Sequence, residues 1–372
     1  MIAIDYSDLH AMIKKNLIRS PLSLCIIILC ISLACGQIGS VSDTGIKLGY
    51  PAADYTGLAW LSETELAAFT ADDAGGVTGY YLENDGHLYS LDLPPFVAKL
   101  DCKGVNENNN IYYTHPSILP DGRLGLINGC ISRGDPPDLK RRYMIAYDFQ
   151  TKETQLLVKE PLPNYLSNAF TWNPDMTTGL VQIYDGLDGT IYWISPEKVE
   201  PVDFAISDGK RSFLPGKDFP RFSEGPEQGI VFSPAWSPDG KTIAFFVTLD
   251  AMGRRDSSRS EGEYKIFFMD PLEQKPGPVV GKIHDPSELI WSPDSKWLAF
   301  IGTYGILRTH GIWMYSVETG KIYRVASGEF SQIAWSPDGN KIAATICEPD
   351  HPNLLCNRFE IWEYDVSSIL KR

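Results

Sequence analysis

Positively charged side chains are scarce in this sequence of 372 residues. Lys and Arg number 33 against 47 Asp and Glu, which gives a formal net charge of −14 at pH 7. A surface with this balance repels the phosphates of nucleic acids and the headgroups of anionic lipids. We therefore expect no nucleic-acid partner. Hydrophobic residues make up 43% of the chain, which excludes global disorder and provides material for a packed core.

The motifs of common enzyme classes are missing as well. The chain has no G-x-S-x-G, no H-E-x-x-H and no glycine-rich phosphate loop after a predicted strand, and it shows no α/β segment of hydrolase size. The sequence therefore favours a protein that is not an enzyme, and we expect neither a cofactor nor a bound metal.

One uncharged apolar run stands out, at residues 21–34. Lys14, Lys15 and Arg19 precede it, and it ends in small residues. This order is typical of a secretory signal peptide. A membrane-spanning helix needs about 20 apolar residues, and this run is shorter. We predict a signal peptide over residues 1–34, with Met12 as an alternative start.

The end of that run, Ser32-Leu33-Ala34-Cys35, resembles the lipobox of bacterial lipoproteins. The resemblance implies that Cys35 is lipidated, that residues 35–45 form a flexible tether, and that the lipid is the only membrane contact. The exported protein would then lie at the outer face of the cytoplasmic membrane, in the periplasm or at the cell surface. Because Ser32 and Ala34 also suit ordinary small-x-small cleavage, simple secretion is the alternative.

Cysteines are few, seven in all, and Cys25, Cys30 and Cys35 belong to the export region. The remaining four are an even number in an exported chain, which indicates two disulfides with three connectivities. We favour the pairs that are closest in sequence. These are Cys102 with Cys130 and Cys347 with Cys356. Unpaired buried thiols are the alternative, and the absence of C-x-x-C spacing among the four disfavours zinc.

A repeat organises the rest of the chain. Residues 236–245 read WSPDGKTIAF, residues 291–300 read WSPDSKWLAF and residues 335–344 read WSPDGNKIAA, and weaker copies start at residues 60, 118 and 172. Pro, Asp and Gly at these positions are turn residues. Each copy follows a short apolar strand and precedes strands with period-2 patterning. Four antiparallel strands in roughly 50 residues correspond to one blade of a β-propeller.

These copies resemble the TolB-type, WD-repeat-like β-propeller family over about residues 50–372. The resemblance implies an all-β fold with six blades of four antiparallel strands, formed as one unit by residues 46–372. We expect residues 45–50 to close the ring as the outer strand of the last blade, and we expect a monomer.

The repeated Asp and Trp residues have a structural explanation. Because they recur at the same place in each unit, we predict that the aspartates cap turns and the tryptophans pack between blades. These residues are Asp121, Asp175, Asp239, Asp294 and Asp338, and Trp60, Trp172, Trp236, Trp291 and Trp335.

Candidate functional residues are those that differ between units. His115 precedes an inner strand and could face the central channel, and Glu288 and Gln332 hold similar positions in units five and six. We interpret the three as a polar channel lining. The alternative is that they contribute to a channel-metal site of a lyase or hydrolase that acts on a saccharide, as in some propeller lyases.

Two loops are candidate contact surfaces, because rigid scaffolds carry recognition on their loops. Arg254, Arg255 and Arg259 lie within the insertion at residues 248–263 and could contact an acidic partner. Leu354 and Leu355 lie between Cys347 and Cys356 and could form an apolar contact point. A solvated loop and packing against a neighbouring loop are the respective alternatives.

Taken together, the residues predict an exported scaffold of the bacterial cell envelope that holds a protein, peptide or glycan partner on its loop face. The saccharide lyase or hydrolase is the alternative function. A structural spacer without a dedicated ligand is a third.

Overall fold

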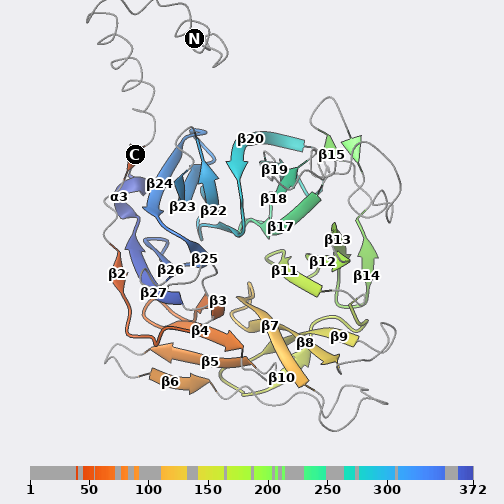
Figure 1. The fold of residues 1–372 in the computed structure, drawn as a ribbon. Helices are drawn as coiled ribbons and strands as arrows, with labels where there is room; N and C mark the ends of the chain where they lie inside the picture. The colour runs from red at the N-terminus through yellow and green to blue at the C-terminus, as the bar shows by residue number, and fades with distance from the viewer. Residues whose placement is uncertain are drawn as a thin grey trace, which may run out of the picture.

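The computed structural model describes residues 39–40, 45–53, 55–71, 77–82, 88–91, 110–131, 141–162, 166–185, 188–202, 206–207, 212–213, 230–248, 264–272, 276–305, 309–347 and 359–371. These residues form β-strands almost throughout, and the sheets stand in a ring (Figure 1). The predicted signal peptide and Cys35 lie outside the described residues.

Four four-stranded sheets make up blades 1, 2, 3 and 6. Blade 1 consists of β3 (Tyr55–Trp60), β4 (Leu66–Ala71), β5 (Val77–Leu82) and β6 (Leu88–Leu91). Blade 2 consists of β7 (Asn110–Ile118), β8 (Leu124–Ile131), β9 (Arg141–Tyr147) and β10 (Thr154–Leu156). Blade 3 consists of β11 (Leu166–Trp172), β12 (Gly179–Asp185), β13 (Asp188–Ile194) and β14 (Val199–Pro201). Blade 6 consists of β25 (Phe330–Trp335), β26 (Lys341–Cys347), β27 (Phe359–Asp365) and β2 (Ile46–Lys47).

A nine-stranded sheet holds two further four-stranded units, which we take as blades 4 and 5. Blade 4 consists of β17 (Ile230–Trp236), β18 (Ile243–Thr248), β19 (Tyr264–Met269) and β20 (Pro276–His284). Blade 5 consists of β21 (Leu289–Trp291), β22 (Trp297–Tyr304), β23 (Thr309–Ser316) and β24 (Ile322–Ser327). The two units are joined because the end of β20 pairs with β22, through Ile283↔Tyr304 and His284↔Thr303. Four separate four-stranded sheets are found among the described residues, and the count of six blades that the repeat predicts depends on this division of the nine-stranded sheet.

Three short elements lie outside this pattern. β1 (Gly39–Ser40) runs parallel to β24, and β15 (Ile206–Ser207) pairs with β16 (Ser212–Phe213). The chain then ends its described part with a helix of four residues, α3 (Ser367–Leu370).

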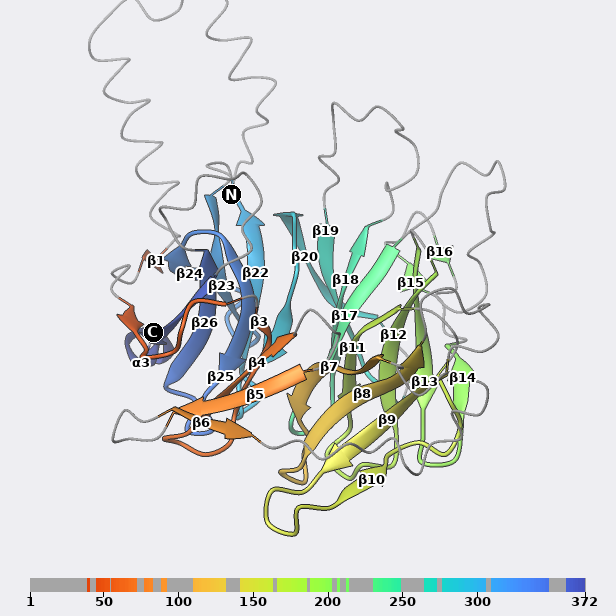
Figure 2. The ribbon, with the colours of Figure 1, turned by 60° about the horizontal axis from the view of Figure 1, so that its bottom comes forward.

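The ring is closed by the N-terminal segment, as the sequence predicts. In blade 6, β2 pairs with β27 through Ile46↔Glu363 and Lys47↔Trp362, and so supplies the outer strand. Figure 1 shows β2 beside β27, and Figure 2 shows β3 of blade 1 beside β25 and β26 of blade 6. Gly45 allows the segment to pass, because a Cβ at this position would lie 2.5 Å from Cε1 of Tyr364.

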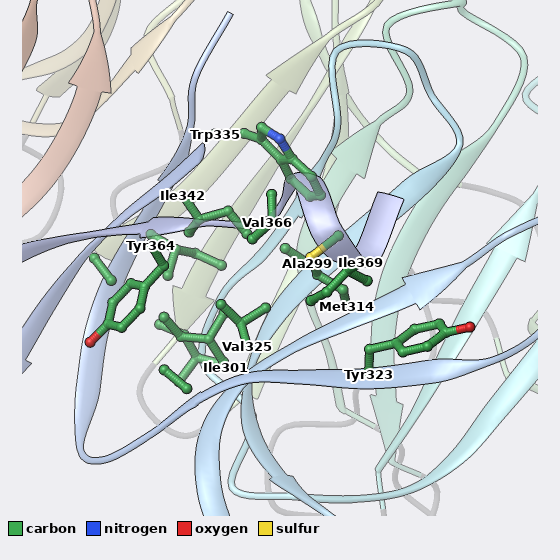
Figure 3. Close-up of a cluster of buried hydrophobic side chains, with 14 of the residues drawn as sticks. Ala299, Ile301, Met314, Tyr323, Val325, Trp335, Ile342, Tyr364, Val366 and Ile369 are labelled. Carbon is green, nitrogen blue, oxygen red and sulfur yellow. The ribbon is translucent and has the colours of Figure 1, made fainter. Parts of the chain in front are cut away.

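The core is divided among the blade interfaces. Among the described residues, six clusters of buried side chains are found, and each draws its members from two neighbouring blades. The period-2 alternation of β22 explains how: Leu298 and Phe300 face blade 4, whereas Ala299 and Ile301 face blade 6. Figure 3 shows the cluster between blades 5 and 6, in which Ile301 and Trp335 take part.

The repeated aspartates cap turns as predicted. In blade 4, Ser237 Oγ donates to Asp239 Oδ1 (2.7 Å), which also accepts from the Lys241 N–H (3.1 Å). Gly240 follows with a φ of 75°. In blade 6 the Ser336 hydroxyl makes the same bond to Asp338, and this bond lowers the pKa of the Asp338 carboxyl.

The tryptophans of the repeat lie at the ends of the inner strands, and two of them form hydrogen bonds between blades. The indole of Trp60 in blade 1 donates to Ala334 O of blade 6 (3.2 Å). That of Trp291 in blade 5 donates to Ala235 O of blade 4 (3.0 Å). Both contacts support the structural interpretation of the repeat.

Candidate functional site: the central channel

The inner strands of all six blades surround a cavity of about 960 Å³. Its wall is formed by residues of β3, β7, β11, β17, β21 and β25, together with the segment that precedes β21. The Trp residues and turn prolines of the repeat form one part of this wall, to which Thr56, Ser233 and Gln332 contribute polar side chains.

Breaks in strand pairing place these polar residues. The register between the inner strand and its neighbour shifts at Thr56 in β3, at His115 and Pro116 in β7, and at Asn168 in β11. It also shifts at Ser233 and Pro234 in β17 and at Ser331 and Gln332 in β25. Bulges of this kind re-aim side chains and are over-represented next to binding sites.

A chain of hydrogen bonds crosses the channel wall from blade 3 to blade 6, and we call it the polar belt. The N–H of Ser233 donates to Gln182 Oε1 (2.9 Å), and the Ser233 hydroxyl donates to the carbonyl of Ser287 (2.9 Å). The next residue, Glu288, accepts a hydrogen bond at Oε2 from the N–H of Ile333. The polar belt therefore joins four consecutive blades at the cavity.

Glu288 is the titratable group of the belt. It lies deep below the outer surface but keeps some exposure to the cavity. Burial raises the pKa of its carboxyl to about 8, and the hydrogen bond from Ile333 opposes this rise only in part. The carboxyl is therefore largely protonated at pH 7.

Gln182 carries an unsatisfied donor. Its side chain lines the cavity and is 1% exposed, and its Nε2 has no hydrogen-bond partner. The bond from Ser233 to Oε1 fixes which end of the amide is the oxygen. A buried donor left unpaired costs about 1–3 kcal/mol, which a bound acceptor would recover.

The structure brings together two of the residues that the sequence singles out. Glu288 and Gln332 both line the cavity, one directly before β21 and the other inside β25. His115 lies inside β7, which begins at Asn110, rather than before the strand as expected. Its side chain is outside the described part of the structure. A role of these residues in binding stays a prediction.

The sequence did not indicate Gln182 and Ser233. Gln182 lies on β12, the second strand of its blade, and pairs with Ala169 directly beside the break at Asn168. Ser233 sits in the β17 bulge with a φ of 50°. The Ser-Pro dipeptide at residues 233–234 was the one signal that could have marked this bulge.

The loop candidates cannot be placed. Arg254, Arg255, Arg259, Leu354 and Leu355 lie outside the described residues. Cys347 at the end of β26 is disulfide-bonded. Its predicted partner Cys356 and also Cys102 lie outside the described residues, as does the side chain of Cys130, so both pairings stay predictions.

The described residues hold neither a metal-binding cluster nor a membrane-spanning helix. No three His, Cys, Asp or Glu side chains gather there in a way that could hold a metal ion. No helix in this part of the chain has the length and apolar character needed to cross a membrane.

Neither a family model nor a curated protein matches the sequence. Solved structures do match. TolB from Acinetobacter baumannii is 14% identical with a TM-score of 0.48, and the match covers 81% of this chain and 64% of that one. An oligogalacturonate lyase in complex with manganese is 14% identical with a TM-score of 0.49, covering 86% and 91%. The gluconolactonase XC5397 from Xanthomonas campestris is 13% identical with a TM-score of 0.46, covering 85% and 86%. The likeness concerns the fold alone, which is a β-propeller with TolB structures among its matches.

Proposed function

We propose that the protein is an exported binding propeller of the bacterial cell envelope, which holds a protein, peptide or glycan partner where the polar belt borders its central channel. The observation that carries this proposal is the belt itself. It places Gln182, whose buried Nε2 has no hydrogen-bond partner, and the buried carboxyl of Glu288 in the wall of one cavity.

The size and lining of the cavity support binding. Its volume of about 960 Å³ falls within the range of ligand sites, and its wall is largely apolar with a few convergent polar groups. Rigid blades hold these groups, because every interface between blades is filled by a buried cluster. Little ordering cost then remains for the protein when a partner binds.

The chemistry of the lining favours binding over catalysis. Among the described lining residues, Glu288 is the only ionisable side chain, whereas general acid–base chemistry usually needs a second group of matched pKa. The location is proposed from the signal-like residues 1–34 and the lipobox-like Cys35, which suggest a lipid anchor that precedes the ring-closing strand β2 in the sequence.

Site-specific photo-crosslinking in cells tests this function. A benzoylphenylalanine at Ser287, which is exposed and lines the cavity, should capture one stoichiometric partner. The same group at Gln150, in an exposed turn of blade 2, is the control and should not. Cys35→Ser separates anchoring from binding.

Protein and glycan stains distinguish the partner classes. Equal capture from Ser287 and Gln150 would overturn the channel as the contact. The absence of any partner, together with manganese-dependent cleavage of a saccharide that is lost in His115→Ala, would instead establish the enzyme alternative.

A further inference from the structure

We propose that the channel binds a primary ammonium group with Glu288 as its counter-ion, while the Nε2 of Gln182 donates to an oxygen atom of the same ligand. This inference rests on the proposed function, since it names the chemical group that the channel recognises.

The first argument is the fixed position of the Glu288 carboxyl. The Ser233 hydroxyl holds the carbonyl of the preceding Ser287, and the Ile301 N–H donates to the Glu288 carbonyl (3.1 Å). Within the carboxyl, Oε2 is occupied by the Ile333 N–H. Oε1 makes no hydrogen bond to a described residue and is left for a ligand.

The second argument is the charge around Glu288. The elements that border it offer Phe232 and Ser233 from β17, the Ile301 backbone from β22, and residues 331–333 from β25, and none of these is ionisable. On its own segment, Asp285 is exposed, and His284 Nδ1 is buried without a hydrogen-bond partner. The His115 side chain on β7 lies outside the described part.

An anionic ligand would therefore find no described positive group in this wall, whereas a cation would find a buried counter-ion. The net charge of −14 also draws cations toward the protein. An ammonium group at Oε1 would ionise the carboxyl, and the Ile333 N–H is already placed to stabilise the charged form.

The third argument is Gln182. Its unpaired Nε2 is a donor only, so it selects an acceptor oxygen in the ligand. Ser233 and Ser287 separate Gln182 from Glu288 along the polar belt, so the ligand needs its ammonium and its oxygen at two ends of an extended group. A lysyl residue of a peptide and an amino sugar both supply this combination.

Methyl NMR of the exported protein carrying Cys35→Ser tests the proposal, because Leu289 and Ile333 are methyl-bearing residues of the cavity wall. The probes are Nα-acetyl-lysine methylamide and glucosamine. The neutral controls are Nα-acetyl-norleucine methylamide and N-acetylglucosamine. We expect saturable shifts of the Leu289 and Ile333 methyl signals with the amines, and at least a tenfold weaker effect with the controls. The amine that binds more tightly shows whether the natural ligand is a lysyl residue of a peptide or an amino sugar.

Two variants sharpen the result. Glu288→Gln keeps an acceptor for the Ile333 N–H but removes the counter-ion, and should weaken amine binding at least tenfold without lowering the melting temperature at pH 7. Gln182→Met removes the Nε2 donor without adding a charge and should weaken binding of the lysine probe. Calorimetry of that probe at pH 7 in two buffers should show net release of protons on binding, as Glu288 ionises.

Equal shifts with amines and controls, or unchanged amine binding in Glu288→Gln, would overturn the proposal. If crosslinking from Ser287 persists in that case, only the ammonium assignment fails. If crosslinking is also absent, the binding function fails with it.

Discussion

Lys47 on the ring-closing strand forms an ion pair with Glu360 on the neighbouring strand β27. The same carboxylate accepts a hydrogen bond from the indole of Trp362 (3.1 Å). The bond from Lys47 is the main reason why the pKa of the Glu360 carboxyl lies below its usual value. The N-terminal segment is therefore held to blade 6 by charge as well as by backbone pairing.

Acid should weaken this closure. Because the folded-state pKa of Glu360 is lowered, its stabilisation is present above the unfolded-state pKa and is lost as pH falls through the folded value. We expect Glu360→Gln to lower the free energy of unfolding at pH 7 but to match the wild type near pH 3, by urea denaturation at both pH values. The matched control is Glu197→Gln. It breaks the exposed pair of Lys159 and Glu197 (2.7 Å), which should contribute less than about 1 kcal/mol. Equal losses at pH 3 and pH 7 would contradict the prediction.

Glu288 should give the opposite dependence on pH. Its folded-state pKa of about 8 lies above the ordinary value of 4.5, so between these values the folded protein binds more protons than the unfolded chain. Stability should then fall as pH rises from about 5 to 8, by up to about 1.4 kcal/mol per pH unit for one proton. Glu288→Gln should remove this slope, as measured by urea midpoints at pH 5, 7 and 9. Parallel curves for the two proteins would refute the raised pKa.

Two equivalent turns allow a matched test of backbone strain. The turn after β9 holds Lys152 at a φ of 60°, and the turn after β23 holds Gly320 at 67°. Each N–H makes the same 2.9 Å bond, to Asp148 O and to Ser316 O respectively. A left-handed backbone costs a residue with a Cβ about 1–2 kcal/mol. Lys152→Gly should therefore raise the melting temperature and Gly320→Lys should lower it, by calorimetry. A lower melting temperature for Lys152→Gly would show that the turn is not strained.

Cys347 is disulfide-bonded, and we predict Cys356 as its partner. Loss of a disulfide that closes so short a loop should cost about 2–3 kcal/mol. Cys347→Ser, Cys356→Ser and the double variant should then lose the same stability, measured by urea denaturation without reductant. An additional loss in the double variant would assign Cys347 to another cysteine, and peptide mapping would identify it.

Most of the fold could be predicted from the repeat, because its Pro, Asp and Gly residues favour turns through local interactions. The inner strand of blade 4 is expected at residues 230–236 and lies there as β17. Ser295 shows how strict the turn is, since it keeps a left-handed φ of 60° where three other copies have Gly. Its hydroxyl also accepts a bond from the Asp239 N–H of the neighbouring blade (3.0 Å).

Only some of the residues that line the channel could be predicted from the sequence. Glu288 and Gln332 stand out because they occupy comparable positions ahead of or within an inner strand. Gln182 does not, because its place in the wall depends on the break in pairing at Asn168 and on the N–H of Ser233 in the next blade. The fusion of blades 4 and 5 also has no local signal, since it depends on how far the end of β20 reaches toward β22.

The N-terminal chain contacts the ring twice before it enters blade 1. β1 lies against β24 of blade 5, and β2 lies against β27 of blade 6. Tension applied to the chain ahead of Gly39 therefore meets the β1–β24 contact first. The pairs that keep the ring shut bear mechanical load only after that first contact has parted, so a pull on the N-terminus is resisted first by blade 5 and then by blade 6.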